Sequence, residues 1–274
     1  MTAYPPRMPG HLTICPTPIG NLDDLTPRVR AAFAACNLVA CEDTRRTGLL
    51  LHNLGITVRM LSIEAHREDS QVPELLRRLQ AGDHVCLATD AGMPLVSDPG
   101  GAVVRAAIAS GIAIEVLPGA DAVTTALVAS GLPSDRFAFV GFLPRGAAAI
   151  GKTLDTADAW GITLVAFESP NRLPSTLAVL AERAPARCVA VCRELTKLHE
   201  EIARGTAIEL ADHFATAPKG EIAIVLEAVA AATAEATAIE ETLAELRERG
   251  LGAKDAARLV ARLIGKSARD LYRP

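Results

Sequence analysis

Two carboxylates lie in a long glycine- and proline-rich turn in the first half of the chain. The run Leu87–Gly100 reads LATDAGMPLVSDPG and carries Asp90 and Asp98. The apolar stretch 84–88 predicts a buried strand, and 101–110 has the apolar spacing of a helix. Open α/β sheets bind ligands at the carboxyl ends of their strands, so an acid at this position is a candidate ligand contact. The alternative is a connection that needs glycine and proline only to turn a corner.

The elements that would position these acids alternate regularly between strand and helix. Five apolar stretches predict strands, at 11–16, 38–41, 58–63, 84–88 and 112–117. Each precedes a predicted helix, at 27–35, 44–54, 72–80, 101–110 and 122–130, the first capped by Thr26 with Pro27 at its first position and the second capped by Thr44. Five strand–helix units in succession predict a mainly parallel sheet covered by helices on both faces.

A second set of elements follows, and its order predicts a second α/β domain. Strands are expected at 138–142, 163–167, 188–192 and 222–227, and helices at 172–183 and 207–214. The Gly/Ala-rich segment 145–152 is expected to be a mobile loop, and 194–201 is a charged excursion between elements. The predicted organisation is a flexible N-terminus (1–10), two α/β domains (11–120 and 121–230) and a small basic helical domain (235–274).

Composition favours a cytoplasmic protein without a membrane segment. Half of the 274 residues are hydrophobic, which is enough for a sizeable core. Six cysteines lie in apolar runs without a CxxC pair, as reduced core residues do. No stretch reaches membrane-spanning length, and none has the pattern of a signal peptide. The net charge of −4 argues against nonspecific nucleic-acid coating, yet residues 247–274 hold eight Lys or Arg against three acids.

Common nucleotide and metal motifs are absent. The first strand is followed by TPIGNL, with one glycine, Gly20, where a dinucleotide-binding domain would have GxGxxG. There is no Walker lysine after a glycine-rich loop, no GxSxG and no HExxH, so no metal site is predicted. His52, His84 and His213 are interpreted as ordinary surface or hydrogen-bonded core histidines. The ligand is therefore expected to be held by several irregular loops.

Seven stretches, read together, resemble the tetrapyrrole-methylase superfamily. They are PTPIGNLDDLTPR (16–28), CEDTRRTGLLL (41–51), TDAGMPLVSDPG (89–100), LPGADAVTTALVASGLPSDRF (117–137), FES (167–169), RELTKLHEE (193–201) and KGE (219–221). The resemblance covers about residues 11–272 and is strongest to the branch that methylates a cytidine ribose of 16S rRNA. The chain departs from the family pattern at Met93, at Ala120 and Asp121, and at Asn171.

The resemblance implies a homodimer that binds S-adenosylmethionine in a cleft between two α/β domains and needs no metal. Carried over by motif, the donor contacts would be Leu12, Pro18, Gly20, Asp90, Gly92, Met93, Ala120, Asp121, Ala122 and Phe167. The implied reaction is 2′-O-methylation of a cytidine in the decoding region of 16S rRNA. Such a transfer is an in-line displacement by the ribose 2′-oxygen, so the enzyme must align two reactants and accept a proton.

Candidates for that proton acceptor are Glu42, Asp43, His66, Glu168 and Lys219. Glu42 or Asp43 is expected to place the 2′-hydroxyl, although EDTR has the alternative role of capping the helix that follows. For RNA, Arg45 and Arg46 would hold phosphate, and His66 and Arg67 lie in a loop on the same side. Lys254, Arg258 and Arg262 form one helical stripe in the tail, which fits either an RNA-binding surface or a solvated amphipathic face.

Two other functions stay open from the sequence. One is a tetrapyrrole C-methyltransferase, which would need a cleft for a flat anionic macrocycle and has no use for the basic tail. The other is a noncatalytic ribosome-binding module on the same fold. Donor binding separates the enzymes from the module, and mapping of rRNA methylation separates the two enzymes.

Overall fold

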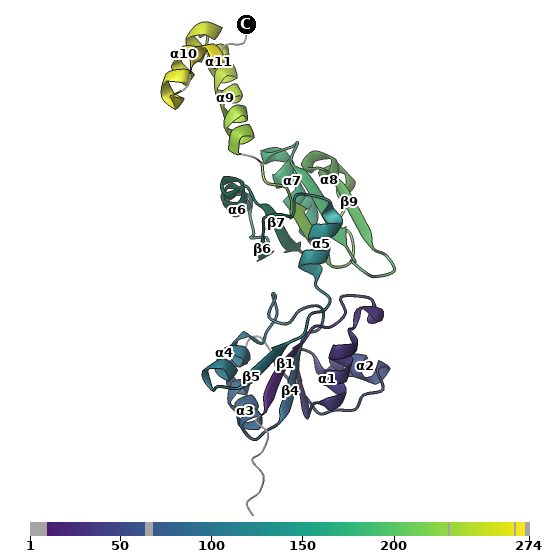
Figure 1. The fold of residues 1–274 in the computed structure, drawn as a ribbon. Helices are drawn as coiled ribbons and strands as arrows, with labels where there is room; N and C mark the ends of the chain where they lie inside the picture. The colour runs from purple at the N-terminus through teal and green to yellow at the C-terminus, as the bar shows by residue number, and fades with distance from the viewer. Residues whose placement is uncertain (1–9, 64–67, 230, 266, 272–274) are drawn as a thin grey trace, which may run out of the picture.

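The computed structural model describes residues 10–63, 68–229, 231–265 and 267–271. Its first sheet has five parallel strands in the order β3-β2-β4-β1-β5 (Figure 1). The strands are β1 (His11–Cys15), β2 (Leu38–Cys41), β3 (Met60–Ser62), β4 (His84–Ala88) and β5 (Ala113–Val116). The predicted parallel α/β sheet is confirmed, and all its carboxyl ends lie along one edge.

Helices cover both faces of this sheet because apolar residues of the strands point alternately to each side. On one face α1 (Pro27–Ala35) and α2 (Thr44–Asn53) bury Val29, Phe33 and Leu51 against the sheet. On the other, α3 (Glu68–Gln80) and α4 (Gly101–Ala109) pack against it through residues such as Leu75 and Val103. A short 3₁₀ turn, η1 (Leu22–Asp24), precedes α1.

Helix caps explain where α1 and α2 begin. Thr26 accepts a hydrogen bond from the Val29 backbone N–H with Pro27 at the first helical position, as predicted. The prediction that Thr44 caps α2 is wrong, because the cap is Asp43, whose carboxylate accepts the Arg45 backbone N–H at 2.8 Å. Asp43 therefore has a structural task in the helix start.

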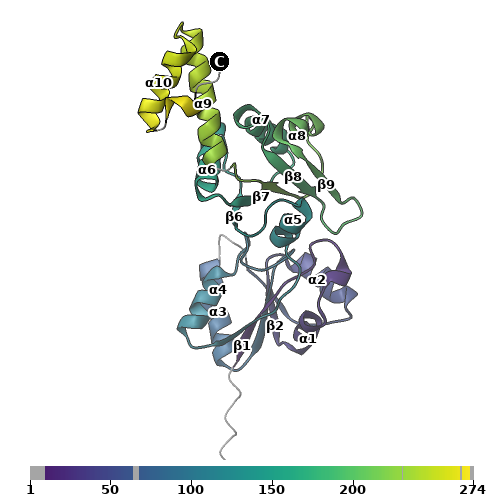
Figure 2. The same cartoon turned by 45° about the horizontal axis from the view of Figure 1, so that its top comes forward.

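The second sheet also has five strands, in the order β6-β7-β10-β8-β9, and only β6 and β7 run parallel. The strands are β6 (Phe137–Phe142), β7 (Thr163–Glu168), β8 (Cys188–Arg193), β9 (Glu201–Thr206) and β10 (Ile222–Leu226). Its helices are α5 (Ala122–Ser130), α6 (Ala147–Trp160), α7 (Leu173–Arg183) and α8 (Ala207–His213). In Figures 1 and 2, α5 lies between the two sheets, while α6, α7 and α8 cover the opposite side of the second one.

One prediction for this half is wrong, and one strand was not predicted. The segment 145–152, expected to be a mobile loop, contains the start of α6, because Ile150, Leu154 and Ala157 form an apolar stripe buried against the sheet. The charged run 194–201 leads into an edge strand, β9, that was not expected. Its first residue, Glu201, pairs with Arg193 of β8 both in strand register and through a 2.8 Å ion pair.

A helical appendage follows the second sheet and stands apart from it, joined through α9 (Figures 1 and 2). It consists of α9 (Ala231–Glu248), α10 (Ala253–Ile264) and α11 (Ala268–Leu271). Its small core includes Leu243 of α9 with Ala257 and Val260 of α10. No helix in the described residues is both long and apolar enough to cross a membrane. The domain boundaries at 11–120, 121–230 and 235–274 stay a prediction.

Candidate active site

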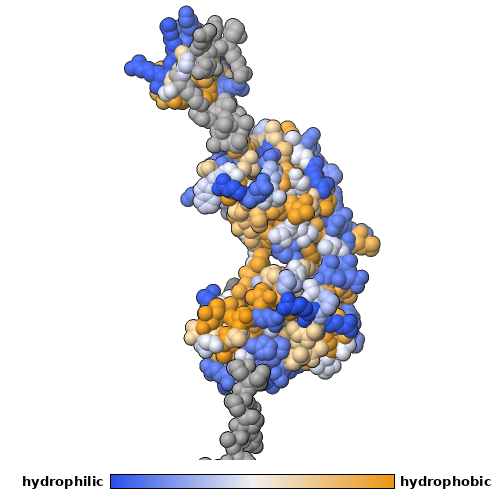
Figure 3. All heavy atoms as spheres, viewed as in Figure 1, coloured by the Kyte–Doolittle hydropathy of each residue, from blue (hydrophilic) through white to orange (hydrophobic). Residues whose placement is uncertain are grey.

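A cavity of about 430 Å³ lies between the two sheets. Figure 3 shows the molecular outline indented between the two sheet-bearing halves, with hydrophobic residues beside the indentation. The cavity is lined by loops and strand ends of both halves and by the start of α5: Ile19, 91–93, 96–98, Asp121, Ala122, Phe142, 167–170, Cys192, Leu195 and 220–223. An apolar cavity of this volume with a few polar groups is typical of a small-molecule site.

The turn after β4 lines the cavity on the side of the first sheet, and its backbone is strained at two residues. Leu95 and Ser97 adopt positive φ angles of 73° and 68°, which are uncommon for residues with a side chain. Gly92, with φ of 82°, exchanges two backbone hydrogen bonds with Thr17, at 2.9 and 3.0 Å. Non-glycine residues held in this conformation concentrate at ligand sites, which supports the interpretation of the turn as a ligand contact.

A loop of the second half closes on a loop of the first. The Asn21 backbone N–H donates to Thr196 Oγ at 3.1 Å, and a side chain at Gly20 would collide with Lys197 and Thr196. Lys197 Nζ in turn pairs with Glu194 at 2.8 Å and Glu221 at 2.9 Å. These contacts join the loop after β1 to the loops before β9 and β10 at the cavity mouth.

Beside the cavity lies a smaller depression of about 240 Å³. The two share Ile19, Ala91 and Glu221 as a common wall. Residues that line the depression alone come mainly from the loop after β1 and from α2: Thr17, Pro18, Gly20, Leu22, Arg46, Leu49, Leu50, Asn53, Asp90 and Lys197. A ligand in the depression and a ligand in the cavity would therefore lie next to each other and contact these three residues in common.

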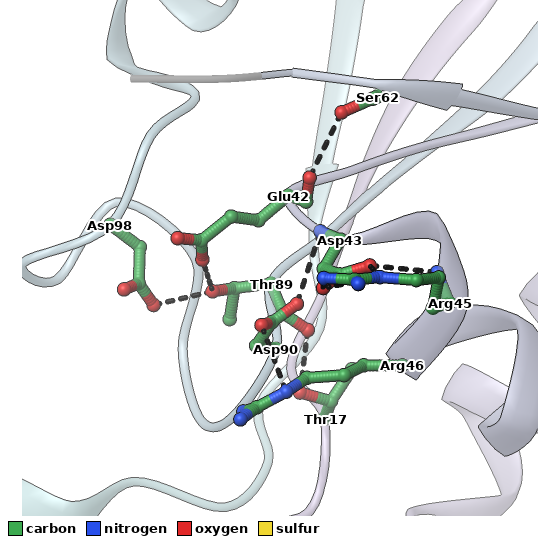
Figure 4. A network of polar contacts seen from close by, with 9 residues as sticks. All are labelled: Thr17, Glu42, Asp43, Arg45, Arg46, Ser62, Thr89, Asp90 and Asp98. Carbon is green, nitrogen blue, oxygen red and sulfur yellow. Dashed lines mark hydrogen bonds and ion pairs between the residues drawn. The ribbon is translucent and has the colours of Figure 1, made fainter. Parts of the chain in front are cut away.

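Three carboxylates gather around Thr89 next to these two hollows (Figure 4). Thr89 Oγ lies 2.5 Å from Asp98 Oδ2 and 3.4 Å from Glu42 Oε2. Asp90 accepts the Asp43 backbone N–H at 3.1 Å and lies 3.5 Å from Arg46 Nε. Asp98 lines the cavity and Asp90 lines the depression, so the two acids of the turn serve different hollows.

Burial and mutual repulsion set the protonation of this cluster. Burial raises the pKa of Glu42, Asp90 and Asp98 above the ordinary range, and the negative charge of Asp90 raises that of the other two further. The opposite holds for Asp43, whose pKa is lowered to about 2 by hydrogen bonds from the Arg45 side chain and backbone. A carboxylate with a raised pKa is a better proton acceptor than one with a lowered pKa.

Replacing Glu42 by glutamine is expected to raise the melting temperature at neutral pH. A carboxyl whose pKa is higher in the folded than in the unfolded state destabilises the fold once the pH exceeds the unfolded value. Removing that charge should stabilise by roughly 0.5 kcal/mol, a small figure because Glu42 is only half-buried and solvent screens it.

Thermal unfolding followed by circular dichroism at several pH values measures this effect. The gain should decline as the pH falls below the folded pKa and disappear below the unfolded pKa, where the wild-type carboxyl is protonated in both states. Asp43→Asn is the matched control with the opposite sign, since it loses the ion pair that lowers the Asp43 pKa. A lower melting temperature for Glu42→Gln would contradict the assignment of Glu42 as an unfavourable charge.

The predicted donor contacts divide into three groups. Gly92, Met93, Asp121, Ala122 and Phe167 line the large cavity. Pro18, Gly20 and Asp90 line the depression instead. Leu12 and Ala120 line neither hollow: Leu12 is fully buried in the core of the first sheet, and Ala120 packs against the apolar cluster around α5.

Glu168 and Lys219 stay predictions as proton acceptors, and the structure shows their surroundings. The buried Glu168 carboxylate accepts from Thr176 Oγ at 2.6 Å and the Ser169 backbone N–H at 2.7 Å, and pairs with Arg172 at 3.1 Å. Both of its oxygens are occupied, so it braces the cavity wall. The Lys219 side chain is exposed and lines neither hollow. His66 lies outside the described residues.

The predicted RNA contacts are dispersed. Arg45 pairs with Asp43 at 2.7 Å, and Arg46 reaches Asp90 and lines the depression. Arg67 lies outside the described residues. The tail stripe is confirmed as an exposed face of α10, comprising Lys254, Arg258 and Arg262, while Ala257 and Val260 are buried behind it.

Sequence reasoning missed the contributions of Lys197 to the depression and of Leu195 to the cavity. Lys197 had the signal of a charged run after β8. Asp98, singled out as an acid of the turn, lines the cavity. Within the described part of the chain, no three His, Cys, Asp or Glu residues gather in a metal-binding arrangement.

Comparisons with known proteins agree with this geometry. A family model described as Tetrapyrrole (Corrin/Porphyrin) Methylases matches residues 11–211. Ribosomal RNA small subunit methyltransferase I of Mesorhizobium japonicum is 42% identical over 265 residues, covering 96% of this chain and 90% of that protein. The protein of the same name from Escherichia coli O157:H7 is 39% identical over 268 residues, covering 96% and 94%.

Solved structures show the same fold at low identity. A diphthine synthase superposes with a TM-score of 0.65 at 15% identity, covering 79% of this chain and 89% of that one. The uroporphyrin-III C-methyl transferase of Thermus thermophilus, complexed with S-adenyl homocysteine, gives a TM-score of 0.55 at 19% identity, covering 79% and 97%. At such identities the likeness concerns the fold alone.

Proposed function

The chain belongs to the tetrapyrrole methylase family, and on this premise we propose that it is an S-adenosylmethionine-dependent methyltransferase of 16S rRNA. The product would be a 2′-O-methylated cytidine in the decoding region. Supporting the RNA substrate, the two relatives named as rRNA small subunit methyltransferase I are 39% and 42% identical over nearly the whole chain. The enzymes with other substrates are 15% and 19% identical.

The observation that carries the proposal is the apolar cavity between the two sheets. About 430 Å³ lies within the range of roughly 300–1,000 Å³ for sites of drug-sized ligands, which suits a compactly bound donor. Ala122, Phe167 and Met93 would surround the donor, and Asp121 and Asp98 offer polar contacts on the walls. Glu168 would act indirectly, by holding the wall through Arg172 and Thr176.

The chemistry asks little of the protein beyond alignment and proton acceptance. The sulfonium of the donor is already activated, because its leaving group is a neutral thioether. Holding the ribose 2′-oxygen in line with the methyl group supplies much of the rate enhancement. A positioned proton acceptor adds a further factor of about 10²–10⁴. Glu42, Asp90 and Asp98 have the raised pKa values that such a group needs.

The basic tail and the oligomeric state complete the proposal. Lys254, Arg258 and Arg262 present three cations on one exposed face of α10, and this face would contact rRNA phosphates away from the site of transfer. Arg45 would contribute in the same way from α2. The active form would be a homodimer in the cytoplasm, acting on 16S rRNA or the small subunit.

Two measurements test the function. Calorimetry should detect S-adenosylmethionine binding, and its complete absence would leave only a noncatalytic ribosome-binding module. Mass mapping of 16S rRNA from cells lacking the protein should then show the loss of one 2′-O-methylcytidine, restored by the wild-type gene. Retention of every such cytidine, with donor binding intact, would favour the alternative of a tetrapyrrole C-methyltransferase.

A further inference from the structure

We propose that the depression beside the donor cavity is the subsite for the acceptor nucleotide, with Asp90 as the group that accepts its 2′-hydroxyl proton. The inference rests on the proposed function and adds the place where the RNA nucleotide docks. It reassigns Asp90 from the donor side, where the family resemblance put it, to the acceptor side.

The depression adjoins the donor cavity. The depression and the cavity share Ile19, Ala91 and Glu221 as lining residues, so the two hollows lie next to each other. An in-line displacement needs adjacent donor and acceptor sites, since the nucleophile must reach the methyl carbon directly, from the side opposite the sulfur. The depression is therefore correctly placed for the acceptor.

The size and charge of the depression favour a single nucleoside over a tetrapyrrole macrocycle. About 240 Å³ is smaller than typical sites for drug-sized ligands, so a tetrapyrrole would not fit inside. The lining carries two cations, Arg46 and Lys197, and two carboxylates, Asp90 and Glu221, which balance each other. A balanced polar lining suits a neutral ribose and base, whereas a polyanionic macrocycle would need an excess of positive charge.

The rim has the groups that hold one nucleotide of an RNA chain. Leu22 and Leu49 are 53% and 63% exposed and offer an apolar surface against a base. Asn53, at the end of α2, brings an amide that can bond a base edge. Arg46 approaches Asp90 through Nε and is 65% exposed, and Figure 4 shows its guanidinium extending beyond Asp90, where it can meet a phosphate.

Asp90 is the carboxylate of the acidic cluster that lines this depression. The Asp43 backbone N–H and Arg46 fix its orientation, at 3.1 and 3.5 Å, and its side chain retains 20% exposure toward the hollow. In the proposed step the 2′-oxygen bonds to the methyl carbon and the carbon–sulfur bond breaks. The electron pair stays on sulfur, giving S-adenosylhomocysteine, and the hydroxyl proton passes to the Asp90 carboxylate and then to water.

Leu49→Ala provides the cleanest test, because Leu49 carries no charge. Steady-state methylation of a 16S rRNA fragment should show a KM for RNA raised about 3–10-fold with kcat little changed, as expected for lost ground-state binding. Arg46→Ala should raise that KM about 10-fold, corresponding to one lost charged hydrogen bond. The affinity for S-adenosylmethionine, measured by calorimetry, should stay constant in both.

Matched controls exist elsewhere on the surface. Ile108 on α4 is 64% exposed, as Leu49 is, and the Arg77 side chain on α3 is 67% exposed and paired with Glu74. Ile108→Ala and Arg77→Ala should leave the KM for RNA unchanged. Ultraviolet crosslinking of the RNA fragment to the wild type, followed by trypsin digestion, should mark the peptide 47–59, which holds Leu49 and Asn53.

The outcomes distinguish failure of the proposed subsite from failure of the proposed function. If the wild type methylates the rRNA fragment while Leu49→Ala and Arg46→Ala keep its KM and peptide 47–59 stays unmarked, the subsite is wrong and the function stands. If the wild type binds the donor but methylates no rRNA, the proposed function itself falls. A KM effect confined to the two variants on α2, with the crosslink in 47–59, supports the subsite.

Discussion

Replacing Asp90 by asparagine is expected to lower kcat for rRNA methylation about 10²–10⁴-fold, the usual contribution of a positioned proton acceptor. Asparagine keeps the side-chain shape and one oxygen for the Asp43 backbone N–H, but it cannot accept the proton. The affinity for S-adenosylmethionine should change little, because Asp90 lines the depression and not the donor cavity. Single-turnover rates at saturating RNA and donor measure the effect.

The pH profile distinguishes a proton acceptor from a residue that only shapes the site. Burial raises the pKa of Asp90 above 3.8, so the wild-type rate should fall as the pH drops through that raised value. The groups that face Asp90 come from several elements. Arg45 and Arg46 of α2 and its cap Asp43 lie beside it, and Glu42 and Asp98 belong to the same acidic cluster. Lys197 and Glu221 line the same depression. In Asp90→Asn this acidic limb should be lost.

Asp98→Asn is the informative comparison, because Asp98 lines the donor cavity. It should weaken donor binding more than Asp90→Asn does, and it should retain more of kcat once the donor is saturating. The reverse pattern, with Asp90→Asn defective mainly in donor affinity and Asp98→Asn in turnover, would exchange the two roles. It would also return Asp90 to the place that the family resemblance gave it.

The sequence predicted the frame of the protein well where apolar runs have clear ends. The bounds of β2, β4 and α5 agree with the structure, because polar residues or a glycine end each apolar stretch: Glu42 after β2, Thr89 and Asp90 after β4, and Gly131 after α5. It failed at α6, where Ala147–Gly151 looked like a loop although the burial stripe continues to Ala157. It also missed β9, an edge strand whose charged residues hide the alternating pattern.

The sequence could not predict that the candidate site is divided between two hollows. Asp90 and Asp98 are eight residues apart in one turn, and which hollow each faces depends on the positive φ angles at Leu95 and Ser97. Lys197 reaches the depression only because its loop closes on Gly20 and Asn21, far away in the chain. Such long-range packing leaves no local pattern in either segment.

Filling the donor cavity should abolish activity altogether, and Ala122→Phe is a variant that does so. Ala122 lines the cavity as the first residue of α5, directly after its cap Asp121. A phenyl ring there would occupy space that the donor needs. We expect the Kd for S-adenosylmethionine to rise at least about 100-fold, or about 2.7 kcal/mol, with methylation lost at ordinary donor concentrations.

Val128→Phe on the same helix is the matched control, since Val128 is 76% exposed and lines neither hollow. It introduces the same ring without blocking the cavity, so donor affinity and methylation should stay at wild-type levels. Melting temperatures of both variants establish that the helix is intact. Undiminished donor binding by a folded Ala122→Phe protein would mean that the donor does not occupy this cavity, and the assignment of both hollows would then have to be reversed or abandoned.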